Sequence, residues 1–148
     1  IYDEYQLYLA RAFGADAILI ILKGIGQQRA AGLRILAKVL GLAVICEVHS
    51  TLEAEQIVGL KDVVLGINNR NLETLKTNVE NTFDVYNNVL SKKKHPGPIV
   101  CESGIKSEKE VEEIVKKTKI NNFLIGESLL KDLDKKTSLL HRILKISP

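Results

Sequence analysis

Five short apolar runs alternate along the chain with longer segments in which apolar residues recur at helical spacing. We expect strands over 17–22, 42–48, 63–67, 98–101 and 122–126, because near-continuous Val, Ile and Leu character is typical of strands that a parallel sheet buries. The periodic segments predict helices over 3–13, 27–40, 51–58, 79–90, 108–117 and 135–145. Asp3 is the expected N-cap of the first helix, whose apolar face carries Tyr5, Leu9, Ala12 and Phe13.

The alternation of strand and helix predicts a parallel sheet, since parallel strands need crossover connections. Such strands suit either an open doubly wound sheet or part of an eight-stranded barrel. The G-x-G-x-x-G loop of doubly wound folds is incomplete here, because Gly24 and Gly26 lack the third glycine. Polar residues at several strand ends favour the barrel: Lys23, Glu47, Asn68, Glu102 and Gly126. We therefore expect the α/β class and a parallel (β/α) barrel of TIM type.

The segment after the fourth strand passes directly into a polar turn. Glu102, Ser103 and Gly104 follow one another, and Ser107 with Glu110 forms the expected capping box of the next helix. A glycine-containing turn ahead of a helix N-terminus can cradle an anion with its backbone amides. The same residues also fit a capped turn without a ligand, so this segment alone leaves both interpretations open.

Composition describes an ordinary globular chain. Its 148 residues are 45% hydrophobic, enough for a core, and we expect one domain over 1–148. The net charge of +3, from 21 basic and 18 acidic residues, is too small for a nucleic-acid-binding surface. The lysine run at 92–94 is typical of a solvated loop. The longest apolar run cannot span a bilayer and no targeting segment is visible, so we expect no nucleic-acid partner and no membrane association.

The cysteines and histidines show no metal-site pattern. Cys46 and Cys101 both lie within apolar strand segments, so we expect reduced core thiols rather than a disulfide. His49, His95 and His141 have no spacing suited to a metal ion. We expect no metal and no other cofactor.

Polar side chains from three strand ends meet at one rim if the strands are parallel. They are Glu47, Asn68, Arg70, Glu102 and Ser103. Two carboxylates in one site permit acid–base chemistry when their environments separate their affinities for protons. The planar guanidinium of Arg70 suits a carboxylate or a phosphate, although it could instead only neutralise a buried Glu47 or Glu102.

Four short segments carry a pattern beyond their individual chemistry. They are Glu-Val-His at 47–49, Gly-Ile-Asn-Asn-Arg-Asn-Leu at 66–72, Glu-Ser-Gly-Ile at 102–105 and Phe-Leu-Ile-Gly-Glu at 123–127. In order and spacing they resemble the indole-3-glycerol phosphate synthase family, and the first helix with the residues up to Ala17 is also similar to it. The segment at 66–72 is specific, whereas Glu-Ser-Gly is shared with several phosphate-binding barrels.

The resemblance implies a (β/α)8 barrel and a carbon–carbon lyase of tryptophan biosynthesis. Members of the family close 1-(2-carboxyphenylamino)-1-deoxyribulose 5-phosphate into an indole, with loss of carbon dioxide and water. The small-molecule partner implied is therefore this phosphorylated substrate. A cytoplasmic location, or the plastid stroma in a plastid-bearing organism, follows from the same resemblance.

The resemblance also assigns roles to residues of the rim. Ring closure needs an acid for the developing alkoxide, and dehydration needs a base and an acid. The family implies a general base at Glu47, substrate orientation by Asn68 and a second carboxylate at Glu102. The substrate-binding residues that it implies are Arg70 at the anionic end and Ser103, Gly104 and Gly126 around the phosphate.

Departures from the family set limits. Ser50 stands where the family commonly has Asp, and Glu127 follows Gly126 where some members have Ser. The family's general-acid lysine belongs to a strand that would precede Ile1, and Lys23 ends the wrong strand to replace it. We therefore expect a C-terminal partial barrel of about five strands that is inactive alone. Its open edges should pair with a missing N-terminal half, with another chain or by rearrangement.

Two rival functions stay open. Another phosphate-binding barrel enzyme, such as a sugar-phosphate isomerase or an aldolase, would use the same rim. An aldolase needs a desolvated lysine, and Lys23 is the lysine near a strand end. A non-catalytic partial barrel could also keep the phosphate cradle and bind a ligand without turnover.

Overall fold

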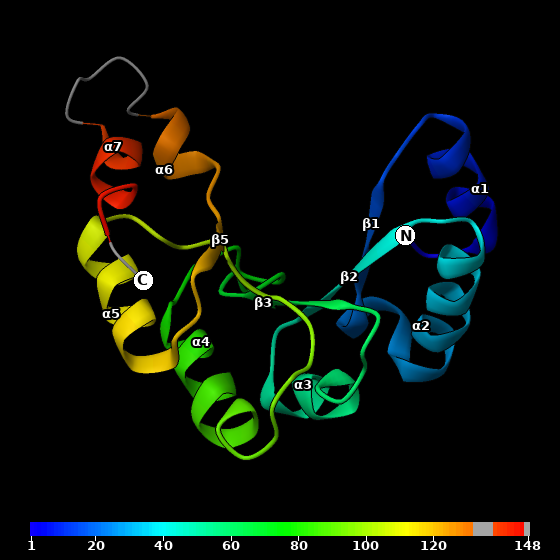
Figure 1. Ribbon diagram of the computed structural model, residues 1–148, viewed down its shortest axis with the longest axis horizontal. Coiled ribbons are helices and arrows are strands. Elements are labelled where there is room, and N and C mark those ends of the chain that lie inside the picture. The colour runs from blue at the N-terminus through cyan, green and yellow to red at the C-terminus, as the bar shows by residue number, and fades with distance from the viewer. Residues whose placement is uncertain (132–137, 147–148) are drawn as a thin grey trace.

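The computed structural model describes residues 1–131 and 138–146, which contain one five-stranded sheet (Figure 1). Its strands are β1 (Ala17–Ile21), β2 (Ala43–Val48), β3 (Val64–Asn68), β4 (Ile99–Glu102) and β5 (Asn122–Leu124). Each strand pairs in parallel with its predecessor, so the sheet order is β1-β2-β3-β4-β5. An order that never reverses is the winding of a (β/α) barrel, whereas a doubly wound sheet reverses at a switch point. The predicted barrel-type fold, here a partial barrel, is confirmed.

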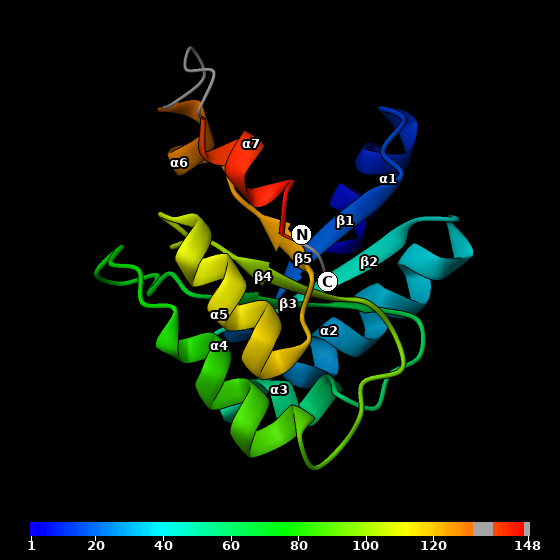
Figure 2. The same ribbon diagram turned by 60° about the vertical axis from the view of Figure 1, so that its left-hand side comes forward.

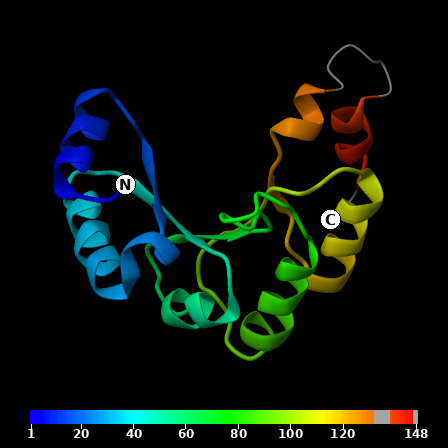
Figure 3. The same cartoon turned by 180° about the vertical axis from the view of Figure 1, so that it is seen from behind.

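One helix precedes β1, and helices follow each strand, with those after β1 to β4 against one side of the sheet (Figure 2). They are α1 (Glu4–Ala12), α2 (Leu22–Val39), α3 (Thr51–Ile57), α4 (Glu80–Val85), α5 (Glu108–Thr118), α6 (Glu127–Leu130) and α7 (Leu139–Ile143). Figure 2 shows α2 to α5 packed below the sheet. In Figure 1 and Figure 3 the sheet curves so that β1 and β5 stand apart across an open side. In the part of the chain that the structure describes, no helix is long and apolar enough to cross a membrane.

The face of the sheet that meets the helices forms the core. Its side chains are almost fully buried: Ile18, Ile20, Val44, Cys46, Val48, Leu65, Ile67 and Cys101. Apolar side chains of the concave face are half-buried: Leu19, Ile21, Ile45, Val64 and Val100. The strands are therefore covered on one face, whereas the apolar runs predict burial on both.

The carboxyl edge of the concave face is polar. Residues that pair across a parallel ladder share a face, and Glu47 lies opposite Gly66, while Asn68 lies opposite Glu102. All four positions therefore face the inside of the curved sheet. Because side chains alternate along each strand, the predicted catalytic side chains lie on the concave face, next to the half-buried apolar residues that precede them in the strands.

Two predicted helix starts are confirmed. Asp3 caps α1 and Gln6 completes the capping box, while Ser107 caps α5 with Glu110 as its partner. Each cap satisfies amide groups that the first turn of a helix leaves unpaired. These residues therefore fix where the preceding loop ends.

Other elements differ from their predicted bounds. Helix α2 begins at Leu22, directly after β1, but the backbone of Gly26 is not helical (φ 74°), so the part after Gly26 agrees with the predicted helix and Leu22–Ile25 is an additional short segment. The end of the predicted helix 79–90 is a π-helical turn, Tyr86–Leu90. Strand β5 stops at Leu124, and α6 has no counterpart among the predicted helices. Of the predicted helix 135–145, residues 135–137 lie outside the described residues, and α7 occupies part of the remainder.

The apolar face expected for α1 is exposed. Tyr5 and Phe13 expose 69% and 87% of their surface, whereas Leu7, outside that predicted face, is fully buried. The other edge of the sheet is similar, since Leu124 of β5 is 61% exposed. The cause is topological, because β1 and β5 are the edge strands of the described sheet. Apolar surface at unpaired strand edges is the kind that a packing partner covers.

Candidate active site

The three predicted catalytic residues meet at the carboxyl ends of adjacent strands. Glu47 lies near the end of β2, Asn68 ends β3 and Glu102 ends β4. They expose 4%, 9% and 3% of their surface. Buried polar side chains need partners, and Asn68 and Glu47 are hydrogen-bonded to one another.

Two neighbours hold one oxygen of Glu47. Asn68 donates from Nδ2 to Glu47 Oε1 over 3.0 Å, and His49 places Nε2 3.1 Å from the same oxygen. The side-chain oxygen of Asn68 accepts the backbone N–H of Arg70 over 2.8 Å. That second bond fixes which end of the Asn68 amide faces the carboxylate.

Glu102 approaches Glu47 across a glycine. Gly66 lies opposite Glu47 in the ladder between β2 and β3. A Cβ at this position would collide with Glu102 Oε1 and would lie 3.0 Å from Cδ. Glycine at position 66 therefore leaves the space in which the Glu102 carboxyl lies across β3.

The carboxyl pair has a perturbed protonation equilibrium. The pKa of Glu102 is raised to about 7, first by burial and then by the hydrogen bond and negative charge of Glu47. Two adjacent carboxyls resist double ionisation, so one proton is retained into the neutral range. The pair can thus supply a proton donor and a proton acceptor side by side.

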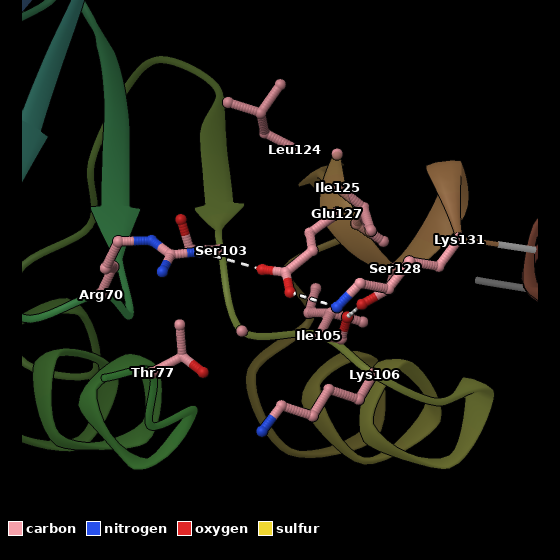
Figure 4. A pocket seen from close by; sticks show the side chains of 12 residues that line it. Arg70, Thr77, Ser103, Ile105, Lys106, Leu124, Ile125, Glu127, Ser128 and Lys131 are labelled. Atoms are coloured by element: carbon pink, nitrogen blue, oxygen red, sulfur yellow. Dashed lines mark hydrogen bonds and ion pairs between the residues drawn. The ribbon is translucent and has the colours of Figure 1, made fainter. Parts of the chain in front are cut away.

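A cavity of about 700 Å³ lies beyond the end of β4 (Figure 4). The four predicted substrate-binding residues all line it: Arg70, Ser103, Gly104 and Gly126. Ser103 and Gly104 have φ values of 63° and 79°, so the chain turns sharply there. A Cβ on Gly104 would lie 3.0 Å from Thr77 Cβ, and backbone and space together favour glycine.

Charged side chains surround this cavity. Figure 4 shows Arg70 and Lys131 on opposite sides of Glu127. Arg70 Nη2 lies 3.6 Å from Glu127 Oε2, and Lys131 Nζ donates to Glu127 Oε1 over 2.6 Å. Lys131 first, and then Arg70, lowers the pKa of Glu127. The alternative expectation that Arg70 neutralises Glu47 or Glu102 is wrong, because its carboxylate partner is Glu127.

Asn69, which is not among the predicted site residues, supports the turn from the side of the helices. It is 3% exposed and donates from Nδ2 to the backbone oxygen of Ser103 over 3.2 Å. Its Oδ1 accepts the amide and the hydroxyl of Thr82 at 3.1 and 2.8 Å. The sequence does contain a signal for this role, namely the pair Asn68-Asn69 at the end of a buried strand. Successive side chains of a strand point to opposite faces of the sheet, so Asn69 faces the helices when Asn68 faces the site.

The remaining candidates for covalent chemistry are unsuited to it. Cys46 and Cys101 are free and buried, as predicted. Burial raises the pKa of Cys46 to about 11 and also raises the pKa of Cys101, so neither thiol is poised to react. Lys23 Nζ lies 2.9 Å from Glu73 on a side chain that is 41% exposed, unlike the desolvated lysine of an aldolase. Among the described residues, no three His, Cys, Asp or Glu side chains gather as metal ligands.

Known proteins share this sequence pattern. A sequence model described as "Indole-3-glycerol phosphate synthase" matches residues 1–141. The indole-3-glycerol phosphate synthase of Polynucleobacter asymbioticus is 42% identical over 137 residues, which cover 93% of this chain and 49% of that protein. That of Burkholderia lata is 41% identical over 131 residues, 88% of this chain and 48% of that protein. The chain thus spans about half the length of these relatives. It belongs to the indole-3-glycerol phosphate synthase family.

Proposed function

We propose that the chain forms the C-terminal part of an indole-3-glycerol phosphate synthase barrel, with residues 1–148 in one domain. In that role it would take part in closing 1-(2-carboxyphenylamino)-1-deoxyribulose 5-phosphate into indole-3-glycerol phosphate, a carboxy-lyase step of tryptophan biosynthesis. The observation that carries the proposal is the carboxyl pair of Glu47 and Glu102 over Gly66, beside a cavity large enough for a phosphorylated small molecule.

The carboxyl pair matches the proton transfers of this reaction. Attack of the electron-rich ring carbon on the ketone creates an alkoxide that must be protonated, and loss of carbon dioxide restores the aromatic ring. Dehydration then removes a proton and a hydroxyl group. We assign the base to Glu47 and substrate orientation to Asn68. Glu102, with its pKa of about 7, would keep a proton available beside the substrate's amine or hydroxyls.

We assign the phosphate to the cavity beyond β4. Ser103, Gly104 and Gly126 line it with short side chains or none, which lets a phosphate approach the backbone. Arg70 and Lys131 already hold one anion there, the carboxylate of Glu127. A phosphate group carries more negative charge than a carboxylate, about −1.5 to −2 at neutral pH. It would therefore compete with Glu127 for the two cations.

The rest of the barrel is the proposed partner at the open edges. About three further strand–helix units would complete eight strands, and the matched segment covers 49% of the Polynucleobacter relative. The exposed face of α1 and the exposed Leu124 of β5 offer those units apolar surface. By the family pattern the general-acid lysine belongs to those further units. We therefore expect the isolated chain to be inactive.

The test joins this chain to the N-terminal half of a bacterial relative as one polypeptide, here called the joined protein. The joined protein should form indole-3-glycerol phosphate, followed by indole fluorescence, and the isolated chain should not. Glu47→Gln should abolish turnover while substrate binding persists. Glu55→Gln, on the exposed side of α3, is the matched control and should turn over normally. Wild-type turnover by Glu47→Gln would overturn the assignment.

A ligand-binding role without turnover is the second candidate, because Arg70, Ser103, Gly104 and Gly126 line one cavity that could hold a phosphate without the catalytic residues. It makes a different prediction for the same experiment. The wild-type joined protein and Glu47→Gln would bind the substrate equally, and neither would convert it.

A further inference from the structure

His49 lies between two carboxylates just after β2. Its side chain is 8% exposed, with Nε2 3.1 Å from Glu47 Oε1 and Nδ1 3.8 Å from Glu53 Oε2. Glu53 Oε2 also accepts the backbone N–H of His49 over 2.7 Å. Ser50, the N-cap of α3, accepts the N–H of Glu53 over 3.3 Å. The first turn of α3 thus positions the carboxylate that faces the ring.

The ring of His49 is enclosed and faces an acid on each side. Among the described residues neither ring nitrogen has a hydrogen bond of good geometry, and buried polar atoms are rarely left in that condition. A neutral imidazole carries one N–H, whereas the imidazolium carries two. The imidazolium is therefore the form that suits a carboxylate at each nitrogen.

The charged residues that share a cavity with His49 are cations. A second cavity, of about 350 Å³, is lined by His49 together with Lys23, Arg70 and Lys76. Lys23 and Arg70 each pair with an acid elsewhere. The acids that face the ring are thus Glu47 from β2 and Glu53 from α3.

We propose that His49, oriented by Glu53, is a positioning residue that keeps Glu47 ionised, so that the proton of the carboxyl pair resides on Glu102. Asn68 donates to Oε1 of Glu47 over 3.0 Å, and Nε2 of His49 lies 3.1 Å from the same oxygen. A cation beside one of two coupled carboxyls favours ionisation of that one and directs the shared proton to the other. The inference rests on the proposed role of Glu47 as the base.

The experiment compares pH profiles of kcat/KM in the joined protein. His49→Gln removes the cation but keeps a side chain able to donate a hydrogen bond. Its acid limb should move to higher pH by about one unit, with kcat near pH 6.5 about tenfold lower and KM almost unchanged. Glu53→Gln should move the limb in the same direction by a smaller amount. His141→Gln, on the exposed side of α7, is the matched control and should keep the wild-type profile.

The outcomes separate this inference from the proposed function. If Glu47→Gln abolishes turnover but His49→Gln keeps the wild-type acid limb, the role of His49 is overturned and that of Glu47 stands. If Glu47→Gln retains turnover, the proposed function fails first. Should His49→Gln fail to fold, ¹⁵N NMR of the unmodified chain gives the answer. Both ring nitrogens of His49 should carry protons at neutral pH, and one bare ring nitrogen would contradict the proposal.

Discussion

The carboxyl pair and the phosphate cavity are built in opposite ways. Glu47 and Glu102 expose only 4% and 3% of their surface, and the space between them exists because residue 66 is glycine. In the cavity, by contrast, the Glu127 side chain is 62% exposed and is held by two cations that a ligand could take over. One region has a fixed geometry, and the other has exchangeable charges.

The difference predicts where substitutions matter most. Buried charges depend strongly on distance and partners, because little water screens them. Exposed ion pairs contribute little to stability. We therefore expect large effects around Gly66 and small ones around Glu127.

Gly66→Ala should have the largest effect, because the new methyl group displaces the Glu102 carboxyl. Turnover of the joined protein should fall about 100-fold, the size expected when a catalytic group moves by ~1 Å. Overpacking should also cost about 1–3 kcal/mol of the free energy of unfolding in urea. Gly32→Ala in α2 is the matched control, since a Cβ there meets open space, and it should add about 0.5–1 kcal/mol. Unchanged turnover in Gly66→Ala would refute the fixed geometry.

Asn69→Ala should destabilise the chain by about 2–4 kcal/mol. The substitution removes a buried partner from the Ser103 carbonyl and from the amide and hydroxyl of Thr82, which keep only their bonds to Val79 and Cys101. Asn88→Ala is the control, because Asn88 makes an exposed bond to the backbone oxygen of Asp84, and it should cost less than about 0.5 kcal/mol. Urea unfolding of the isolated chain measures both, and equal losses would show that Asn69 does not brace the turn.

Glu102 should make the chain less stable as pH rises. Its pKa of about 7 in the folded chain exceeds the ordinary 4.5, so the folded state binds this proton more tightly than the unfolded state does. The resulting stabilisation is complete below pH ~4.5 and is lost as pH rises toward ~7, at most about 3 kcal/mol. Glu102→Gln should flatten this slope, and Glu112→Gln, on the exposed side of α5, should keep it. If the free energy of unfolding of Glu102→Gln still falls with pH as in the unmodified chain, another group causes the pH dependence and the prediction is wrong.

Glu127→Gln should have the smallest effect, and it should strengthen phosphate binding, whereas Gly66→Ala and Asn69→Ala impair the chain. Without the competing carboxylate, Arg70 and Lys131 become available to an anion. The affinity for inorganic phosphate, measured by calorimetry, should rise about two- to fivefold. Glu113→Gln removes an exposed pair with Lys117 on α5 and should leave it unchanged. Weaker phosphate binding in Glu127→Gln would mean that Glu127 helps the site instead of competing for it.

Much of the site could be predicted because parallel topology constrains it. Once strands and helices alternate, the ends of β2, β3 and β4 must share an edge, which brings Glu47, Asn68 and Glu102 together. The caps at Asp3 and Ser107 were equally predictable, because capping depends on side chains a few residues apart.

The rest depends on contacts that sequence spacing does not encode. The role of Gly66 follows from strand register, which brings a side chain from β4 over β3. The partner of Arg70 lies 57 positions later in the chain, at Glu127. The periodicity of α1 marks an apolar face that is exposed in the structure, whereas Leu7, outside that face, is buried, because periodicity cannot say which side of a helix another element covers.

The most direct test of the account is the titration of the Glu102 side chain in the isolated chain, followed by ¹³C NMR of its carboxyl carbon. We predict a midpoint near pH 7, since burial and the neighbouring Glu47 both raise the pKa of Glu102. In Glu47→Gln the midpoint should fall but stay above the ordinary 4.5, because burial is the larger cause. A midpoint near 4.5 in the unmodified chain would show that the two carboxyls are not coupled across Gly66, and would contradict the account.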